Sequence, residues 1–143
     1  MIPNDAPVAD EMSLYRRVHP TEIVWSDNDG CPRPNSSVFK DKEMSINLDD
    51  VLKDEGHGPE SAIDGKPTHS LVSLTAGFVK GEEQEVRRTP KPEDASHGDV
   101  CGEKPGERKK RFARAAQFVI LREEALDPSV LAKMRAATGD GSE

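Results

Sequence analysis

Apolar and polar residues alternate in short runs along the first hundred positions, and this period of two predicts β-strands. Residues 13–18 alternate in this way, and Pro20 ends the run. Residues 43–48 repeat the pattern with their apolar residues on one side. Further strands are predicted at 21–26, 69–79, 85–89 and 99–102. Within residues 69–79, Gly77 is interpreted as a bulge in a continuous strand.

The spacing changes to that of helices in the last third of the chain. Residues 106–117 are rich in helix formers and place Phe112, Ala115 and Ala116 on one face. Residues 117–121 favour a strand, although a single helix over 106–125 stays open as an alternative. Asp127 before Pro128 predicts the start of a last helix. Several short strands followed by helices indicate an α+β fold, mostly an antiparallel sheet with C-terminal helices.

The predicted organisation has one folded unit with loose ends. Residues 1–12 contain prolines and acids and are expected to be a flexible N-terminal arm. Residues 13–138 form a single α+β domain, and residues 139–143 are expected to be a disordered tail. The segment PRPNSS at 32–37 is interpreted as a rigid, hydrogen-bonded connection between elements.

Composition limits the size of the core and the class of protein. The chain has 143 residues, of which 34% are hydrophobic, 33% charged and 4% aromatic, so it can build one modest core. It contains neither a long apolar stretch nor a secretory leader pattern, and we expect no membrane contact. Cys31 and Cys101 are predicted to be free thiols in a cytoplasmic protein.

Charge is distributed unevenly between the two parts of the chain. Residues 1–100 carry 11 Lys/Arg and 20 Asp/Glu, whereas residues 101–143 carry 9 and 7. The net charge of −7 argues against nonspecific binding of nucleic acid by the whole domain, because phosphates would be repelled. Any such binding is therefore expected from the C-terminal part.

The motifs of common catalytic centres are missing from the sequence. The cysteines and histidines are not spaced as zinc ligands, and the glycines do not form a phosphate-binding loop. Ser96, His97 and Asp99 are close in sequence, but neighbours on an extended chain point in different directions and make no triad. We predict no catalytic residue, no metal and no cofactor, and the protein is interpreted as non-enzymatic.

Histidines, arginines and serines recur at the ends of the predicted strands. Side chains in such positions can converge on a cleft for an anionic ligand such as a nucleotide or a phosphorylated group. The alternative is that they are solvated or cap loops. The candidate ligand-binding residues are Arg16, His19, Arg33, Ser36, His69 and His97.

A second group of candidates lies in the basic segment 104–114. Six cations surround one predicted helix and leave free only its apolar stripe. They are interpreted either as a solvated face or as a contact for an acidic partner or for nucleic acid. These cations are Lys104, Arg108, Lys109, Lys110, Arg111 and Arg114.

Four blocks of sequence together carry a resemblance. They are LYRRVHP (14–20), RPNSSVFKDKEMSINL (33–48), HSLVSLTAGF (69–78) and SHGDVCGEKPGERKKRFARAA (96–116). In this order they resemble a group of small bacterial proteins to which no activity is assigned, over about residues 13–121. The resemblance implies a bacterial, cytoplasmic protein and brings no catalytic residue.

These observations favour a non-enzymatic protein-interaction module, a small accessory subunit of a bacterial cytoplasmic complex. The expected partner is a protein that docks on the basic helix. One alternative is an enzyme or binder acting on a nucleotide-like or phosphorylated ligand. A further alternative is association with nucleic acid through residues 104–114.

Overall fold

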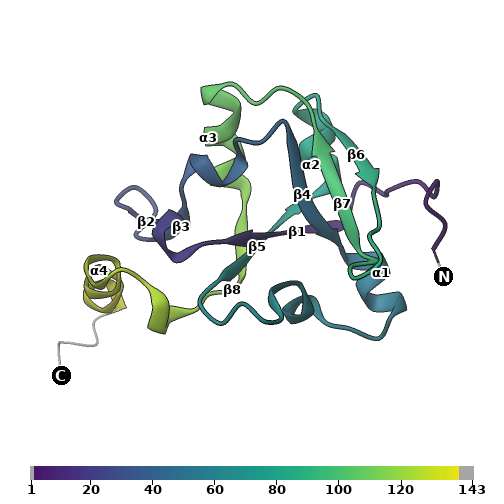
Figure 1. The fold of residues 1–143 in the computed structure, drawn as a ribbon. Coiled ribbons are helices and arrows are strands. Elements are labelled where there is room, and N and C mark those ends of the chain that lie inside the picture. The colour runs from purple at the N-terminus through teal and green to yellow at the C-terminus, as the bar shows by residue number, and fades with distance from the viewer. Residues whose placement is uncertain (1, 139–143) are drawn as a thin grey trace.

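The computed structural model describes residues 2–138, and the predicted tail 139–143 lies outside them. Its main feature is a six-stranded antiparallel sheet with the strand order β6-β7-β4-β1-β5-β8 (Figure 1). The strands are β1 Ser13–Val18, β4 Glu43–Leu48, β5 Ser70–Thr75, β6 Glu85–Arg88, β7 His97–Cys101 and β8 Gln117–Ile120. A separate hairpin pairs β2 Ile23–Ser26 with β3 Cys31–Pro34. The prediction of an α+β fold with an antiparallel sheet is confirmed.

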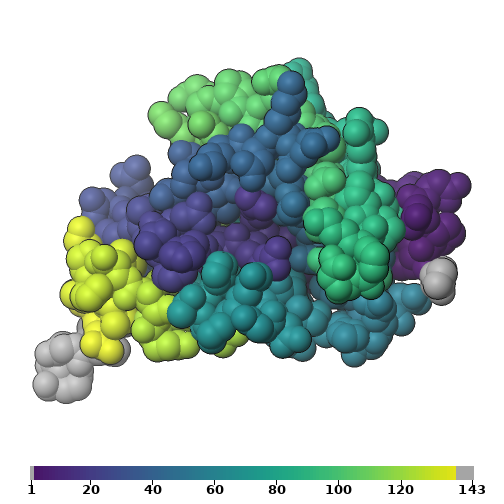
Figure 2. All heavy atoms as spheres, in the orientation of Figure 1, coloured from purple at the N-terminus to yellow at the C-terminus, as the bar shows by residue number. Residues whose placement is uncertain are grey.

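Helices cover parts of both sheet faces. The α-helices are α1 Asp49–Asp54, α2 Ala76–Gly81, α3 Gly106–Ala115 and α4 Pro128–Thr138. Short 3-10 helices are η1 Pro20–Glu22, η2 Ser36–Phe39, η3 Pro59–Ile63 and η4 Glu123–Ala125. Helix α4 packs against the β2–β3 hairpin at one end of the molecule, and the N-terminal segment lies at the other (Figures 1 and 2).

The alternation predicted for the strands divides the sheet into two faces. The apolar even-numbered positions of β1 and β4, such as Leu14 and Ile46, join the main core beneath α2, α3 and η2. Phe39 and Phe112 lie at the centre of this core, with ring centroids 5.8 Å apart. On the opposite face, Tyr15 joins a smaller apolar cluster that α1 and η3 cover. The rest of this second face is polar.

The strand predicted over 69–79 is wrong in its second half. The strand ends at Thr75, whose Oγ1 accepts a hydrogen bond from the amide of Phe78 at 3.2 Å and caps α2. Gly77 lies inside this helix and forms no bulge. Its amide donates to the carbonyl of Asp10 at 2.7 Å, and a Cβ at this position would come within 3.0 Å of Asp10. A larger residue here would therefore require the N-terminal segment to move away by a few tenths of an ångström.

The two alternatives for residues 106–125 are now decided. Helix α3 ends at Ala115, and residues 117–120 form β8, which pairs with β5. The segment 32–37 is also more regular than a connection. Its first half belongs to β3, and its second half begins η2 with Asn35 as the N-cap.

Residues 6–12 contact the sheet and α2, although the sequence predicts a flexible arm over 1–12. The side chain of Val8 belongs to the main core, and Met12 packs against it. The carbonyl of Met12 accepts a hydrogen bond from the amide of Ala76 at 2.9 Å. These contacts hold residues 6–12 in place in the structure, and the mobility of the arm stays a prediction.

Candidate functional site

The six residues predicted to bind one ligand lie in four separate places. His19 follows β1 and His69 precedes β5, and the two rings meet edge to face with centroids 5.2 Å apart. His97 lies on β7, which is separated from β1 by β4. Arg33 lies in β3, and Ser36 is the first residue of η2, the next element along the chain. The structure therefore brings together His19 with His69, and Arg33 with Ser36, but not all six.

Arg16 holds two elements together rather than facing a cleft. Its guanidinium donates to the carbonyl of Val38 at 3.0 and 3.2 Å and to that of Ser45 at 2.9 Å. It also pairs with Asp41 at 3.3 Å. These bonds use donors on all three guanidinium nitrogens, and they tie η2 to β1 and β4.

Arg33 closes the C-terminal end of α3. Its Nη2 donates to the carbonyl of Ala113 at 3.2 Å and also to the carbonyl of Arg114. Its Nε lies 3.6 Å from a carboxylate oxygen of Asp29. The last carbonyls of a helix have no partner within it and carry a partial negative charge, so a cation is stabilising here.

A groove of about 340 Å³ opens where Arg33 meets α3. We call it the hairpin groove, because the β2–β3 hairpin forms one side and α3 the other. Val24, Pro34 and Ala113 supply apolar surface, and Arg33, Lys110 and Arg114 supply positive charge. The other lining residues are Ser26, Asp29, Asn35 and Ser36. The groove thus combines two candidates from the predicted ligand set with two from the basic helix.

Most cations of the basic segment already have partners within the protein. Arg108 and Arg111 both contact the carboxylate of Glu82, at 3.3 and 2.8 Å. Lys110 lies 3.5 Å from Glu107. Among residues 2–138, Lys109 and Arg114 have no ion-pair partner. Association with nucleic acid stays a prediction, and these pairs reduce the charge available to phosphates.

Lys104 is buried rather than part of a basic face. Its side chain reaches the interior, where Nζ donates to the carbonyls of Val100, Gly102 and Lys42 at 3.0, 3.1 and 3.2 Å. Three carbonyls satisfy the three N–H donors of an ammonium group. Lys104 therefore stabilises the turn before α3 and cannot reach a partner on the surface.

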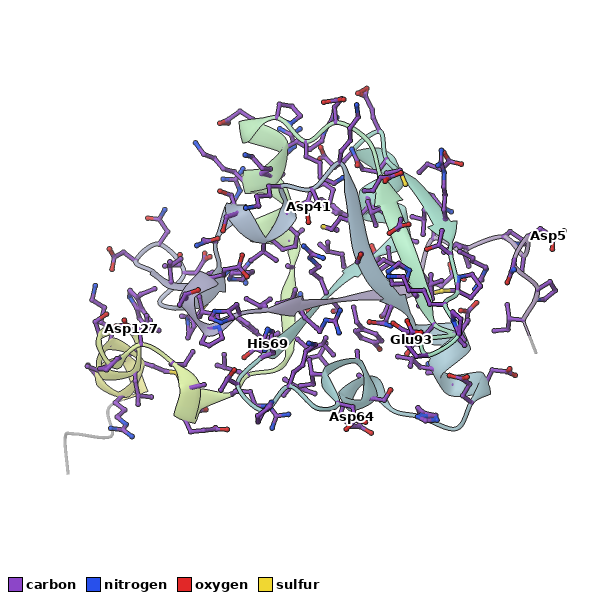
Figure 3. All side chains as sticks on the ribbon, in the orientation of Figure 1. Asp5, Asp41, Asp64, His69, Glu93 and Asp127 are labelled. Atoms are coloured by element: carbon purple, nitrogen blue, oxygen red, sulfur yellow. The ribbon has the colours of Figure 1, made fainter. Side chains whose placement is uncertain are left out.

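A larger cleft of about 630 Å³ lies on the second face of the sheet. We call it the sheet-face cleft. Its floor comes from β1, β4 and β7, and its walls come from residues 52–64 and from the loop 91–96. Figure 3 labels one residue from each wall, Asp64 and Glu93. Of the predicted ligand-binding residues, this cleft contains His97 alone.

Sequence reasoning missed Asn47 and Asp94, which line this cleft beside His97, and named Ser96 only as a neighbour of His97 along the chain. Asn47 donates to Asp94 at 3.0 Å and to Ser96 at 2.7 Å, and both partners are almost 50 positions away in the chain. The only signal was the polar side of the predicted strand 43–48, which carries Ser45 and Asn47. Its partners could not be identified without the fold.

No family model, curated protein or solved structure matches the chain. The candidate sites therefore depend on the geometry and chemistry of their own residues.

Burial shifts the pKa values of two further titratable groups, His69 and Cys101. Burial lowers the pKa of His69, and the neighbouring His19 lowers it further. Burial raises the pKa of the Cys101 thiol, which leaves it a weak nucleophile at neutral pH. Cys31 is also a free thiol.

Residues 2–138 contain no group of three or more His, Cys, Asp or Glu side chains arranged to hold a metal ion. None of the helices in this range combines the length and the apolar character needed to span a bilayer.

Proposed function

We propose that this protein is a non-enzymatic binding module whose hairpin groove holds an acidic segment of a partner protein. The observation that carries the proposal is the combination of apolar surface and positive charge in one groove of an otherwise acidic chain. This composition suits a peptide in which carboxylates alternate with apolar side chains. A small accessory subunit of a bacterial complex would use such a groove to dock.

Arg114 is the residue on which this proposal depends most. It lies at the end of α3, is exposed, and has no ion-pair partner among residues 2–138. Arg33 neutralises the helix end beside it, so the carbonyls of Ala113 and Arg114 do not repel a carboxylate. An incoming carboxylate can therefore pair with Arg114 without breaking an existing ion pair.

The test is fluorescence anisotropy with a labelled peptide that alternates Glu with Leu, and with a matched peptide that alternates Gln with Leu. We expect the Glu peptide to bind more tightly, and its affinity to fall with added salt. Arg114→Ala should weaken binding by up to about 5-fold, because an exposed ion pair contributes up to about 1 kcal/mol.

The matched control is Lys109→Ala. Lys109 lies on the same helix, also lacks an ion-pair partner among residues 2–138, and does not line the groove. Its loss should leave the affinity unchanged. Equal binding of the Glu and Gln peptides, or equal losses in the two variants, would exclude the groove as the docking site.

A second candidate function concerns the same groove. The volume of about 340 Å³ is within the range of small-molecule sites, and Arg33 and Ser36 were both expected to contact a phosphorylated ligand. A thermal-shift screen with nucleotides tests this alternative. A nucleotide at 100 times its dissociation constant should stabilise the protein by about 2.7 kcal/mol. A flat screen together with Glu-peptide binding favours the protein partner.

A further inference from the structure

The sheet-face cleft is a site of different chemistry from the hairpin groove. It lies on the polar part of the second sheet face, against β4 and β7. None of its lining residues belongs to the hairpin groove. An inference about this cleft is therefore independent of the proposed docking function.

One carboxylate at the cleft is held in place by its neighbours. Asp94 accepts hydrogen bonds from Asn47 Nδ2 at 3.0 and 3.2 Å and from Ser96 Oγ at 3.0 Å. Asn47 and Ser96 are both buried, at 7% and 2% exposure. A carboxylate has about four acceptor positions, so Asp94 keeps some of its capacity. The network orients this carboxylate before any ligand arrives.

His97 adds a hydrogen-bond acceptor with no partner. Its Nδ1 lies 3.0 Å from the carbonyl of Thr89, which can only accept. It also lies 2.9 Å from the Thr89 hydroxyl, whose own proton goes to Asp99 at 3.1 Å, and we therefore assign the ring proton to Nδ1. In the neutral ring Nε2 is then an acceptor. Nε2 is buried and has no hydrogen-bond partner, and the whole side chain is only 7% exposed. Buried acceptors without a partner are uncommon, and this one belongs to a residue that lines the cleft. A small shift of the side chains over it would let an N–H or O–H donor of a ligand reach it.

The charges around the cleft also favour a ligand that brings N–H donors. Two cations, Arg17 and Lys91, face four acids, so the lining carries two more negative than positive charges. Among residues 2–138, none of Glu55, Asp64 and Glu93 forms an ion pair. A ligand that brings positive charge and N–H donors would be attracted here, and an isolated phosphate would be repelled.

We propose that the sheet-face cleft binds a small ligand that carries a guanidinium or ammonium group. The oriented carboxylate of Asp94 accepts its N–H donors, and the acids of the two walls attract its charge. His97 Nε2 accepts a further donor at the floor. Arg17, also at the floor, provides a site for a carboxylate when the ligand is an amino acid. The cleft volume of about 630 Å³ is within the usual range for small ligands.

The test is a titration of the ¹⁵N-labelled full chain, followed by NMR. The probes are agmatine, arginine and inorganic phosphate. Agmatine has a guanidinium and an ammonium group but no carboxylate, so it separates recognition of positive charge from recognition of an amino acid. We expect agmatine and arginine to shift the Asn47 side-chain amide and the backbone amides of residues 94–97. Phosphate should leave these signals unchanged.

Substitutions then test which residues contact the probe. Asp94→Asn and Asp64→Asn should each weaken agmatine binding, with a loss of about tenfold or more at the oriented Asp94. Asp64 is exposed at the wall, so its replacement also keeps the test valid if Asp94→Asn perturbs the loop. Arg17→Ala should weaken arginine but not agmatine if the carboxylate is recognised. Equal losses for both probes would contradict that role for Arg17.

The matched control is Asp5→Asn. Asp5 is an exposed acid in the N-terminal segment, outside the cleft (Figure 3). This variant removes the same charge and should bind agmatine like the unmodified protein. The inference is overturned if phosphate shifts the cleft signals in place of the amines, or if no probe shifts them up to about 10 mM. It is also overturned if Asp5→Asn weakens binding as much as Asp64→Asn.

Discussion

Arg88 and Asp50 form a two-pronged ion pair that joins the edge strand β6 to α1. Nη1 and Nη2 of Arg88 contact the two carboxylate oxygens at 3.0 and 2.5 Å. The arginine side chain is only 4% exposed, and it also donates to the carbonyls of Ala6 and Pro7 at 3.0 and 3.3 Å. One guanidinium therefore connects β6, α1 and the N-terminal segment.

Replacement of Arg88 by Met should destabilise the protein strongly. The loss leaves Asp50 and two carbonyls without their donor, and breaking a buried ion pair costs about 3–5 kcal/mol. Denaturation by urea measures the change. The neighbouring Arg87 serves as a control, because it pairs with Glu85 at the surface and Arg87→Met should cost less than about 1 kcal/mol. Equal effects of the two substitutions would contradict the anchoring role of Arg88.

The first two amides of α2 should be protected from hydrogen exchange, because the N-terminal segment accepts their hydrogen bonds. The amides of Ala76 and Gly77 donate to the carbonyls of Met12 and Asp10 at 2.9 and 2.7 Å. If the segment stays in place, both amides exchange slowly, and Arg88→Met speeds their exchange because two bonds to the segment are lost. Fast exchange of both amides in the unmodified protein would support the flexible arm that the sequence predicts.

The strands and helices with a clear apolar period were predicted correctly, because their own residues determine which face is buried. Strand β4 alternates cleanly, and its apolar side packs in the core as period two requires. The helix 106–115 has one apolar stripe, and Phe112 is buried beneath it. The segment around Gly77 was misread because its helix is fixed by contacts with residues 10–12, which no local pattern records.

The candidate sites were less predictable, because each depends on residues far apart in the sequence. Arg33 meets α3 about 80 positions further along the chain. Asn47 meets Asp94 across 47 positions. Arg33 and Ser36 were chosen for their residue types and do lie at one groove, but its other side comes from the segment proposed separately for a partner. Residue types indicated which side chains could bind a ligand, but only the fold shows which of them lie together.

Tyr15 should make stability depend on pH in the alkaline range. Burial and the nearby Asp49 carboxylate raise the pKa of Tyr15 from 10.0 to about 12. Between these values the unfolded chain has released the proton and the folded chain retains it, so the free energy of unfolding falls as the pH rises. Tyr15→Phe removes this titration. Urea midpoints measured below and above pH 10 should therefore decline less in the variant, and an equal decline would refute the assignment.

His69 should make stability depend on pH in the acidic range. Here the free energy of unfolding falls as the pH falls, whereas for Tyr15 it falls as the pH rises. Burial lowers its pKa below 6.5, helped by the positive groups His19, Lys66 and Arg17 and opposed by Glu22. Below about pH 6.5 the unfolded chain binds a proton that the folded chain resists, so stability falls as the pH falls. His69→Gln should reduce the difference in urea midpoint between about pH 7.5 and pH 5. The exposed His57 is the control, and His57→Gln should leave this difference as it is.

Lys104 should stabilise the fold, whereas Lys110 should contribute to docking and little to stability. It is 8% exposed and its three donors are bound to carbonyls, so Lys104→Met leaves those carbonyls unsatisfied. The expected cost is about 1–3 kcal/mol in the free energy of unfolding, measured in urea. Lys110→Met, on the exposed side of α3, should change stability by less than about 0.5 kcal/mol.

For binding of the Glu peptide we expect the reverse order: the loss of Lys110 should matter, and the loss of Lys104 should not. Lys110 lines the hairpin groove, and its loss should weaken the Glu peptide. Lys104 does not reach the surface, so Lys104→Met should bind that peptide normally at temperatures where it stays folded. Normal stability in Lys104→Met combined with weaker peptide binding would show that the ammonium group leaves its carbonyls to meet a partner. Loss of stability with intact binding would assign Lys104 to the fold alone.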